Sequence, residues 1–441
     1  MISRERIKTI FKLAFPMGIA LGSNVVMSLI NLAMIGTLGT YAIAAVGLSS
    51  FSYTLIVAAV VGFAPAVQGL VARRRGEGST ELKCLPLNGG LLAALIIGTP
   101  LIIICYLLTP SFFSMISSDP AVTRVGAPYL RTLYMAIVAV GMNCAFEGFW
   151  TGMEKPKIYM VIALFMDCMN IFLNYILIFG HFGAPALGAK GAAISTVLSL
   201  YTGVAINFVM TSSRFRKEGF LNALPNRSQL ATIFKLALPA TFQGFFLDAG
   251  YLVFFWMLGR VGTAELAAGN ILTRVMLIML LLAMALGNAS ATLVSRTLGE
   301  GDPAGAARWG WDTGKLGFIG LTLLGLPLLL FPKLVLSVFL SDPHTIAITV
   351  IPLQMVGATA GIFSLLHIFA YTLFSVGDGA RVMMVSFGTT WLLFLPAVWY
   401  VGPHSHHGLF PIVLVQGTYS LIATALITSF WAGGKWKKIR I

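Results

Sequence analysis

The sequence predicts an all-α membrane protein whose twelve transmembrane helices form two parallel six-helix lobes. Of its 441 residues, 58% are hydrophobic and only 10% are charged, and the mean hydropathy is +0.89. A soluble domain carries about 25% charged residues, so this chain has too little polar surface to cover its apolar mass in water. The length of its apolar runs and an internal repeat are the other two observations behind this prediction.

Twelve apolar segments account for the predicted helices in order. A helix needs about 20 predominantly apolar residues to cross the hydrocarbon core of a bilayer. A transmembrane β-barrel would instead show shorter segments with alternating polarity. The predicted spans lie near residues 9–36, 43–70, 87–108, 127–150, 156–179, 189–212, 232–258, 266–293, 313–332, 346–375, 381–401 and 409–432.

The two-lobe organisation follows from an internal repeat (offset 223) that keeps its register over much of each half. The sequence TIFKLAFP at 9–16 recurs as TIFKLALP at 232–239, and SDP at 118–120 recurs at 341–343. Each repeat holds an even number of spans, so the second repeat starts on the same side of the membrane as the first. This is the relationship of parallel repeats in transporters.

The charge distribution predicts the topology. The net charge is +14, and the basic residues concentrate at both termini and in alternate loops. The positive-inside rule then places both termini in the cytoplasm of a multi-pass protein in the cell inner membrane. The excess of Lys and Arg over Asp and Glu therefore indicates the topology and an attraction to membrane lipids, and not a nucleic-acid partner. We expect an N-lobe over 1–213, a cytoplasmic linker over 214–230 and a C-lobe over 231–441.

Four segments resemble the multidrug and toxic compound extrusion (MATE) family. They read LINLAMIGTLG at 29–39, GFWTGMEKP at 148–156, NIFLNYILIFG at 170–180 and GAPALGAKGAAIST at 183–196. The resemblance covers essentially the whole chain. It implies a secondary antiporter that exports amphiphilic, often cationic organic compounds by alternating access, driven by inward H⁺ or Na⁺. We expect no enzymatic activity, no cofactor beyond the coupling ion, and a monomer, since the fused repeats already supply both sides of a cleft.

Three other classes of membrane protein are weighed against this one. A major-facilitator transporter also has two six-helix halves, but its usual signature after the second helix is missing here. A lipid or lipid-linked oligosaccharide flippase of the same superfamily is the more serious alternative. Its cavity should be cationic, whereas the arginines inside the predicted spans, away from the span ends, are only Arg131 and Arg274. A membrane-embedded enzyme lacks the paired acids or His/Asp arrangement it would need.

The predicted N-lobe site lies on the fifth helix. Asp167, Asn170 and Asn174 are spaced i, i+3 and i+7, which places them on one stripe. The family resemblance implies a cation site at Asn31, Asn170, Asn174 and Thr196, where Asn31 and Asn174 replace two family carboxylates. Amides can bind Na⁺ but cannot carry a proton, so Asp167 is the candidate for the missing charge. The alternative is that these side chains form structural hydrogen bonds between helices.

The predicted C-lobe site centres on Asp248, near the position where another branch of the family carries a glutamate in helix seven. Arg274 lies too deep in helix eight to snorkel easily, so we expect it to pair with Asp248. The pair could couple transport or be a static salt bridge. Tyr251 and Phe255 follow Asp248 on its stripe and are candidates for the substrate cavity. Asp167 and Asp248 both titrate, which favours H⁺ over Na⁺.

Two further polar features are expected at the surface. Glu147 lies near the end of the fourth span, where a solvated helix end is the simpler interpretation. Three histidines share a short loop that contains no carboxylate, so we expect an exposed turn rather than a metal site. They are His404, His406 and His407.

Overall fold

The computed structural model is helical throughout the part of the chain that it describes, which is residues 2–78, 83–116, 119–340, 342–402 and 409–439. Eleven of its helices are long and apolar enough to cross a membrane. The number rises to twelve if α5 (Pro120–Tyr134) and α6 (Ile137–Gly152), bent by 43° at a short break, are one span. The predicted all-α membrane fold is therefore confirmed. The histidine-rich loop lies outside the described residues.

Contacts between residues divide the chain into two compact units. The N-terminal unit comprises Ile19–Thr241, and the C-terminal unit comprises Phe242–Ile441 together with Met1–Gly18. The division falls inside two long helices, α1 (Arg4–Gly36) and α9 (Arg227–Val261). Each unit therefore contains one end of a helix that continues in the other.

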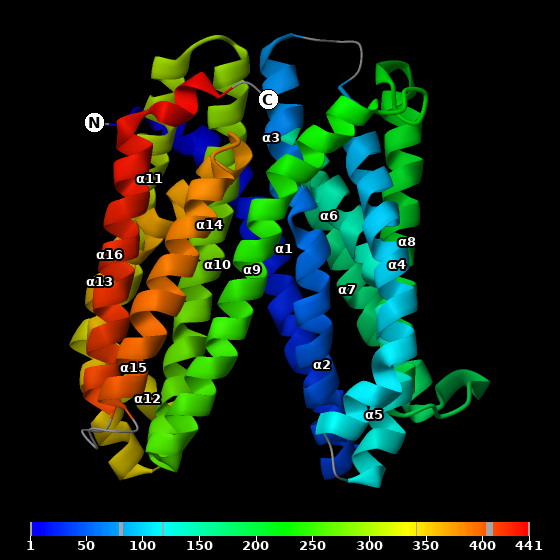
Figure 1. The fold of residues 1–441 in the computed structure, drawn as a ribbon, viewed down its shortest axis with the longest axis vertical. Coiled ribbons are helices and arrows are strands. Elements are labelled where there is room, and N and C mark those ends of the chain that lie inside the picture. Colours follow the sequence, from blue (N-terminus) through cyan, green and yellow to red (C-terminus); the bar gives the residue numbers. More distant parts are fainter. Residues whose placement is uncertain (1, 79–82, 117–118, 341, 403–408, 440–441) are drawn as a thin grey trace. The chain divides into compact units, whose positions relative to one another are not determined.

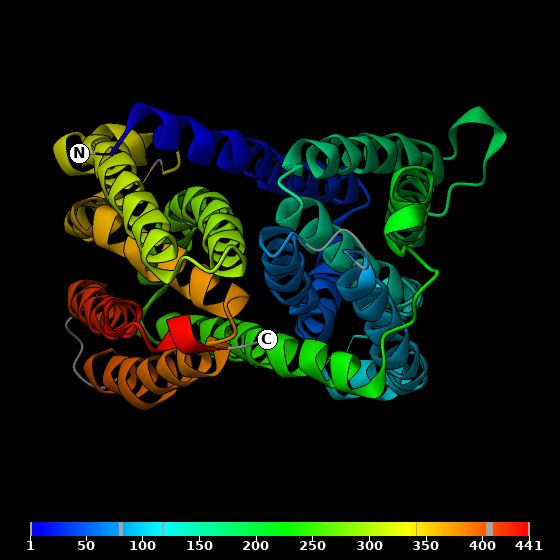
Figure 2. The same cartoon turned by 90° about the horizontal axis from the view of Figure 1, so that it is seen from above.

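The N-terminal unit is a helical bundle in which α3 packs on α6, α7 on α8, and α2 on α5 (Figures 1 and 2). Its interior holds several fully buried aromatic side chains, among them Phe146, Phe149 and Trp150. Besides α5, α6 and its shares of α1 and α9, its elements are α2 (Thr40–Val61), α3 (Phe63–Gly76), α4 (Leu85–Ile116), α7 (Pro156–Phe179), η1 (His181–Gly183), α8 (Ala189–Phe215) and η2 (Arg216–Glu218).

The polar segment that follows α8 is docked on the N-terminal unit. Asn88 of α4 donates its two amide hydrogens to the carbonyls of Gly219 and Ala223, at 2.8 Å each. Its own Oδ1 accepts from the backbone N–H of Leu221 at 3.2 Å. Phe220 is buried beside Phe146, with ring centroids 6.4 Å apart. One side chain thus satisfies three backbone groups of this turn, which holds it as a fixed part of the unit.

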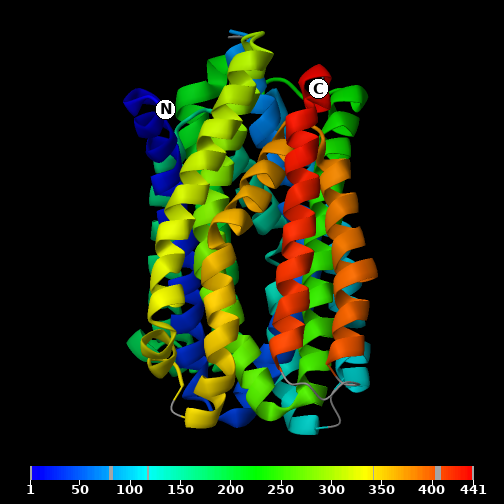
Figure 3. The same ribbon diagram turned by 90° about the vertical axis from the view of Figure 1, so that its left-hand side faces the viewer.

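The C-terminal unit is a second bundle, in which α13 packs on α10, α11 and α16 (Figure 3). Phe254, Phe394 and Leu395 belong to its hydrophobic core. Besides its shares of α1 and α9, its elements are α10 (Thr263–Gly299), α11 (Pro303–Leu330), α12 (Pro332–Ser337), α13 (Pro343–Ser375), α14 (Gly379–Phe387), η3 (Gly388–Phe394, a π-helix), α15 (Leu395–Val401), α16 (Leu409–Gly433) and η4 (Lys435–Lys438).

The first turns of α1 are anchored in the C-terminal unit by charge and by apolar packing. Arg6 forms an ion pair with Asp312 at 3.0 Å, and its guanidinium lies 3.9 Å from the ring centroid of Trp309. Ile10 and Leu13 are buried in a cluster with residues of α10. The start of α1 and the end of α16 lie at the same end of this unit (Figure 1).

The sequence repeat has a structural counterpart at the helix starts. Asp119 caps α5 by accepting from the backbone N–H of Ala121 at 2.8 Å, and Asp342 caps α13 by accepting from that of Thr345 at 2.9 Å. In both copies the next residue is proline, whose missing N–H and fixed φ suit the first position of a helix. The repeated Asp-Pro pair therefore marks the same helix start in each half of the chain.

Candidate functional site

The central helix of the N-terminal site is α7. It begins at Pro156 and ends at Phe179, and the next residue, Gly180, has a φ of 79° in the left-handed region that glycine adopts without strain. Between these ends, Asp167, Asn170 and Asn174 are all buried. The i, i+3, i+7 spacing therefore turns one polar stripe of a membrane-spanning helix toward its neighbours.

Four of the five predicted residues form one chain of hydrogen bonds across three helices. Asn174 of α7 donates through Nδ2 to Oδ1 of Asn31 on α1, and also to Oδ1 of Asn170 at 3.1 Å. Asn170 in turn donates to the hydroxyl of Thr196 on α8 at 3.3 Å and to that of Ser199 at 3.4 Å. We call Asn31, Asn174, Asn170 and Thr196 the amide chain. It ties α7 to α1 and to α8.

Asp167 contacts α1 independently of the amide chain. Its Oδ2 accepts a hydrogen bond of 2.6 Å from the hydroxyl of Ser23. Sequence reasoning missed both Ser23 and Ser199. The available signal was their spacing, because Ser23 precedes Asn31 on the same helix by about two turns and Ser199 follows Thr196 by about one.

The amide chain itself is electrically neutral. Asn174 is fully buried, and its Oδ1 has no hydrogen-bond partner in the structure. A buried polar atom without a partner is rare in native proteins and calls for an explanation. Amide oxygens are ligands for hard cations, and here the nearest charge on the same stripe is that of Asp167. Within the described residues, no three His, Cys, Asp or Glu side chains cluster in a way that could hold a metal ion.

The expected ion pair between Asp248 and Arg274 is wrong. No ion pair joins them in the structure, and Arg274 is exposed. The buried stripe of α10 passes through Leu272, Val275 and Met279. Arg274 lies outside that stripe, so its depth along the helix does not place it in the interior of the unit.

The two aromatic candidates on α9 differ in their surroundings. Tyr251 is 44% exposed. Phe255 packs against the hydrophobic core of the C-terminal unit and contacts Phe254, with ring centroids 5.4 Å apart. Tyr251 is therefore free to meet a ligand, whereas Phe255 is largely occupied by packing.

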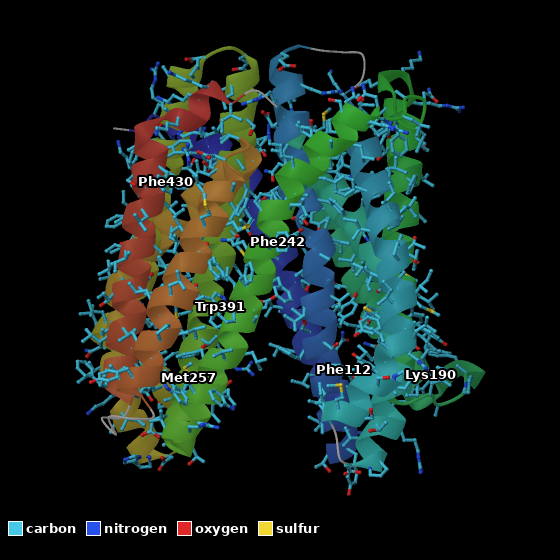
Figure 4. All side chains as sticks on the ribbon, in the orientation of Figure 1. Phe112, Lys190, Phe242, Met257, Trp391 and Phe430 are labelled. Carbon is cyan, nitrogen blue, oxygen red and sulfur yellow. The ribbon has the colours of Figure 1, made fainter. Side chains whose placement is uncertain are left out.

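A polar contact between α9 and α14 was not anticipated from the sequence. Gln243 donates to the hydroxyl of Ser386 at 2.9 Å, and Trp391 in the π-helix η3 donates through Nε1 to the carbonyl of Phe246 at 3.0 Å. Figure 4 labels Phe242 on α9 and Trp391 on η3. Such π-helical turns occur often at functional sites, but no periodicity in the sequence signals one.

Glu147 is half-buried and hydrogen-bonded to α7 rather than at a freely solvated helix end, contrary to the expectation. Its Oε2 accepts a hydrogen bond of 3.2 Å from the phenol of Tyr159. The residues on either side of it, Phe146 and Gly148, are both buried. The expectation failed because the start of α7 covers this part of α6, which the position of Glu147 along its own helix could not reveal.

Two bundles of membrane-spanning helices related by a sequence repeat, with polar side chains buried in mid-span, are the architecture of a secondary transporter. A family model described as MatE matches residues 16–176 and again residues 239–399. The two matches stand in the same register as the internal repeat, since both limits shift by one common offset. They cover more than half of the sequence, and the chain belongs to the MATE family of membrane transporters.

Individual relatives are distant, and some of them match nearly the whole chain. The sequence is 26% identical over 446 residues to the probable multidrug resistance protein NorM of Thermotoga maritima, covering 98% of this chain and 93% of that protein. The fold is similar to a mutant of the Vibrio cholerae MATE transporter VcmN, with a TM-score of 0.88, 19% identity and 97% of each chain covered. It is also similar to a MATE protein in complex with MaL6, with a TM-score of 0.86, 17% identity and coverage of 98% and 97%.

Proposed function

We propose that this chain is a cation-coupled antiporter that exports amphiphilic, often cationic organic compounds by alternating access. Inward movement of H⁺ or Na⁺ would favour one conformation and the organic substrate another, which is the condition for coupling. The family assignment supports transport, and the name of the Thermotoga maritima relative supports a multidrug substrate range. The positive-inside rule supports a location in the cell inner membrane with both termini in the cytoplasm, and the two fused repeats support a monomer.

The observation that carries the proposal is the amide chain beside Asp167. Polar side chains in the middle of membrane spans are energetically unfavourable and normally mark ion or substrate pathways. Here three helices contribute oxygen atoms to one buried network, and Oδ1 of Asn174 lacks a partner. A cation or a water that serves this oxygen would find the carboxylate of Asp167 about two turns away on the same stripe of α7.

The C-terminal unit supplies the second candidate group. Asp248 lies within α9, and no ion pair occupies it in the described structure, so its carboxylate is available to a proton or to an organic cation. Tyr251, one turn further along, is exposed enough to contact a ligand. We propose that Asp248 and Tyr251 face the substrate and that the N-terminal unit binds the coupling ion.

The test is efflux from proteoliposomes or whole cells under Na⁺ and pH gradients imposed separately. Ethidium and norfloxacin serve as substrates. Wild type is compared with Asp167→Asn and Asp248→Asn, and with Glu300→Gln as a matched control, because Glu300 is an exposed acid in a surface ion pair with Arg296. Antiport predicts efflux that follows one gradient, is lost in one of the two Asp variants, and is unchanged in the control.

The flippase alternative makes a different prediction in the same preparation. A folded wild-type protein that moves neither compound under either gradient contradicts the exporter. Translocation of a fluorescent lipid analogue, measured in the same vesicles, would then identify the chain as a flippase.

A further inference from the structure

Glu147 and Tyr159 form a half-buried acid–phenol pair that the amide chain does not include. Glu147 lies five residues before the end of α6, and Tyr159 is the fourth residue of α7. Consecutive helices joined by a short turn bring these two positions to the same end of the unit. The 3.2 Å hydrogen bond therefore lies between that end and Asp167, further along α7.

Around the pair lie a thiol and a carboxyl group, and no ion pair with a base involves it in the described structure. The titratable groups around it are Cys144 of α6 and Asp167 of α7. Of the basic residues at this end, Arg75 pairs with Glu154, and Lys155 lies over the ring of Phe215. In the described structure no ion pair involves Glu147, so no fixed positive charge holds it permanently ionised.

The pair lies on a route from Asp167 to the helix end. Tyr159 and Asp167 are eight residues apart on α7, which is about 12 Å along the helix axis. Because Asn31 and Asn174 are amides, the amide chain offers no group that can take up and release a proton. Carboxyl and phenol groups can do both, and Asp167, Tyr159 and Glu147 succeed one another toward the end of the unit.

The repeat provides an independent observation. Its offset carries Glu147 onto Ala370 and Tyr159 onto Val382, both buried in the hydrophobic interior of the C-terminal unit. The fold therefore does not need an acid or a phenol at these positions. The pair occurs only in the half of the chain that also contains Asp167 and the amide chain.

We propose that Glu147 and Tyr159 are the proton exit of the N-terminal unit, leading from Asp167 to the cytoplasmic side. The inference rests on the proposed function, and it specifies H⁺ as the coupling ion. Protonated Asp167 gives its proton, through water, to the phenol oxygen of Tyr159, while the phenol proton passes to the carboxylate of Glu147. Glu147 then releases that proton to cytoplasmic water. The phenol ends as it began, and one proton has moved from one carboxylate to the other.

The test compares two transport modes in proteoliposomes loaded with ethidium. Efflux driven by a pH gradient requires net proton movement, whereas exchange of labelled for unlabelled substrate does not. We expect Glu147→Gln to reduce gradient-driven efflux by about tenfold or more, the loss typical of a missing proton-transfer group, and to leave exchange within about twofold. Tyr159→Phe should act in the same direction. Glu154→Gln, which alters an acid at the same end that is paired with Arg75, should leave both modes unchanged.

Other outcomes overturn the inference in distinguishable ways. Full gradient-driven efflux in Glu147→Gln excludes Glu147 from the proton path. Loss of exchange together with gradient-driven efflux shows a structural role instead. Wild-type efflux that follows only Na⁺ overturns the proton exit and leaves antiport standing. Wild-type efflux that follows neither gradient contradicts the proposed function itself.

Discussion

In the N-terminal unit α7 faces its neighbours with amides, whereas the matching helix of the C-terminal unit faces its neighbours with apolar groups. The repeat carries Asn31 onto Phe254, Asn170 onto Leu393, Asn174 onto Ala397 and Thr196 onto Tyr419. In place of the hydrogen-bonded chain there is an aromatic cluster: Phe394 lies 5.4 Å from Phe254 and 5.0 Å from Tyr419 between ring centroids.

The difference shows which features the fold requires. Both units form the same kind of helical bundle, so the framework depends on apolar length and on helix starts such as those at Asp119 and Asp342. The amide chain is not needed for folding, because the other repeat has apolar and aromatic side chains at the equivalent positions. Hydrogen bonds between helices in a membrane add only modest stability. The occurrence of the amide chain in one repeat alone therefore argues for a role in transport.

The comparison also holds in the opposite direction. Asp248 and Arg274 of the C-terminal unit correspond to Val25 and Phe51 of the other. Each unit therefore carries ionisable groups where its counterpart is apolar. The two halves are not interchangeable, and experiments that exchange equivalent residues should have unequal effects.

The largest effect on stability is expected when a core residue of the C-terminal unit is replaced by its N-terminal equivalent. Phe254→Asn removes a buried ring that is 4% exposed and buries an amide with no partner. The free energy of unfolding should fall by about 3–5 kcal/mol. The measurement is thermal or chemical unfolding in detergent micelles.

The matched control is Phe242→Asn, because Phe242 lies on the same helix and is 46% exposed. Its effect should be about 0.5 kcal/mol. Equal stability of the two variants would mean that the aromatic cluster does not carry the core of the C-terminal unit.

The reverse exchange should damage transport more than stability. Asn174→Leu leaves the Oδ1 atoms of Asn31 and Asn170 without their donor, which should lower the free energy of unfolding by about 1–3 kcal/mol. Gradient-driven efflux should be lost while the protein remains folded. Asn174→Asp has the same shape and restores an acid, so we expect it to retain efflux.

Transport by Asn174→Leu at the wild-type rate would contradict a role for the amide chain. In that case the hydrogen bonds of Asn174 would be structural. Comparing the free energies of unfolding of Asn174→Leu and Asn174→Asp would then show how much those hydrogen bonds stabilise the protein.

Regular spacing predicted the helices and placed Asn170 and Asn174 on one stripe, whereas Asn31 and Thr196 of the amide chain were implied only by the resemblance to the MATE family. The length of an apolar run fixes a span, and i, i+3, i+7 fixes a stripe on one helix. The same reasoning failed for Arg274, since depth along a helix does not say which face carries the residue. It failed for Glu147 and for the turn docked by Asn88 because their partners lie on other segments, which no local pattern specifies.

A smaller effect is expected at a turn that the two repeats build with different residues. Glu154 adopts a φ of 54°, and its equivalent Gly377 adopts 95°. A residue with a Cβ loses roughly 1–2 kcal/mol in the left-handed region, whereas the partly exposed ion pair of Glu154 with Arg75 contributes up to about 1 kcal/mol. Glu154→Gly should therefore raise the free energy of unfolding by about 1 kcal/mol or slightly less, measured as above.

The reciprocal substitution tests the same argument without an ion pair. Gly377→Ala should lower the free energy of unfolding by roughly 1–2 kcal/mol. If Glu154→Gly is destabilising while Gly377→Ala behaves as expected, the interactions of Glu154 outweigh its strain.

At the last pair of equivalent positions, one repeat has a buried acid where the other has a base. Asp378 corresponds to Lys155 and lies between α13 and α14, where its Oδ2 is 3.0 Å from Nη1 of Arg381. Burial raises the pKa of Asp378, and Arg381 offsets part of that rise. Folding therefore favours the protonated form. The contribution of protonated Asp378 to the free energy of unfolding is fully present below the pKa of an unfolded Asp, about 3.9. It is lost as the pH rises through the pKa of Asp378 in the folded protein.

Asp378→Asn cannot titrate, so over this window wild type should lose stability relative to the variant as the pH rises. Asp342→Asn is the control of opposite sign. Hydrogen bonds from Thr345 lower the pKa of Asp342, so its contribution is present above the unfolded pKa and is lost as the pH falls through the folded pKa. Wild type should therefore gain stability relative to that variant as the pH rises through the same region. Unfolding curves from pH 3 to 7 that move in the same direction for both variants would contradict the assignment of burial as the dominant cause at Asp378.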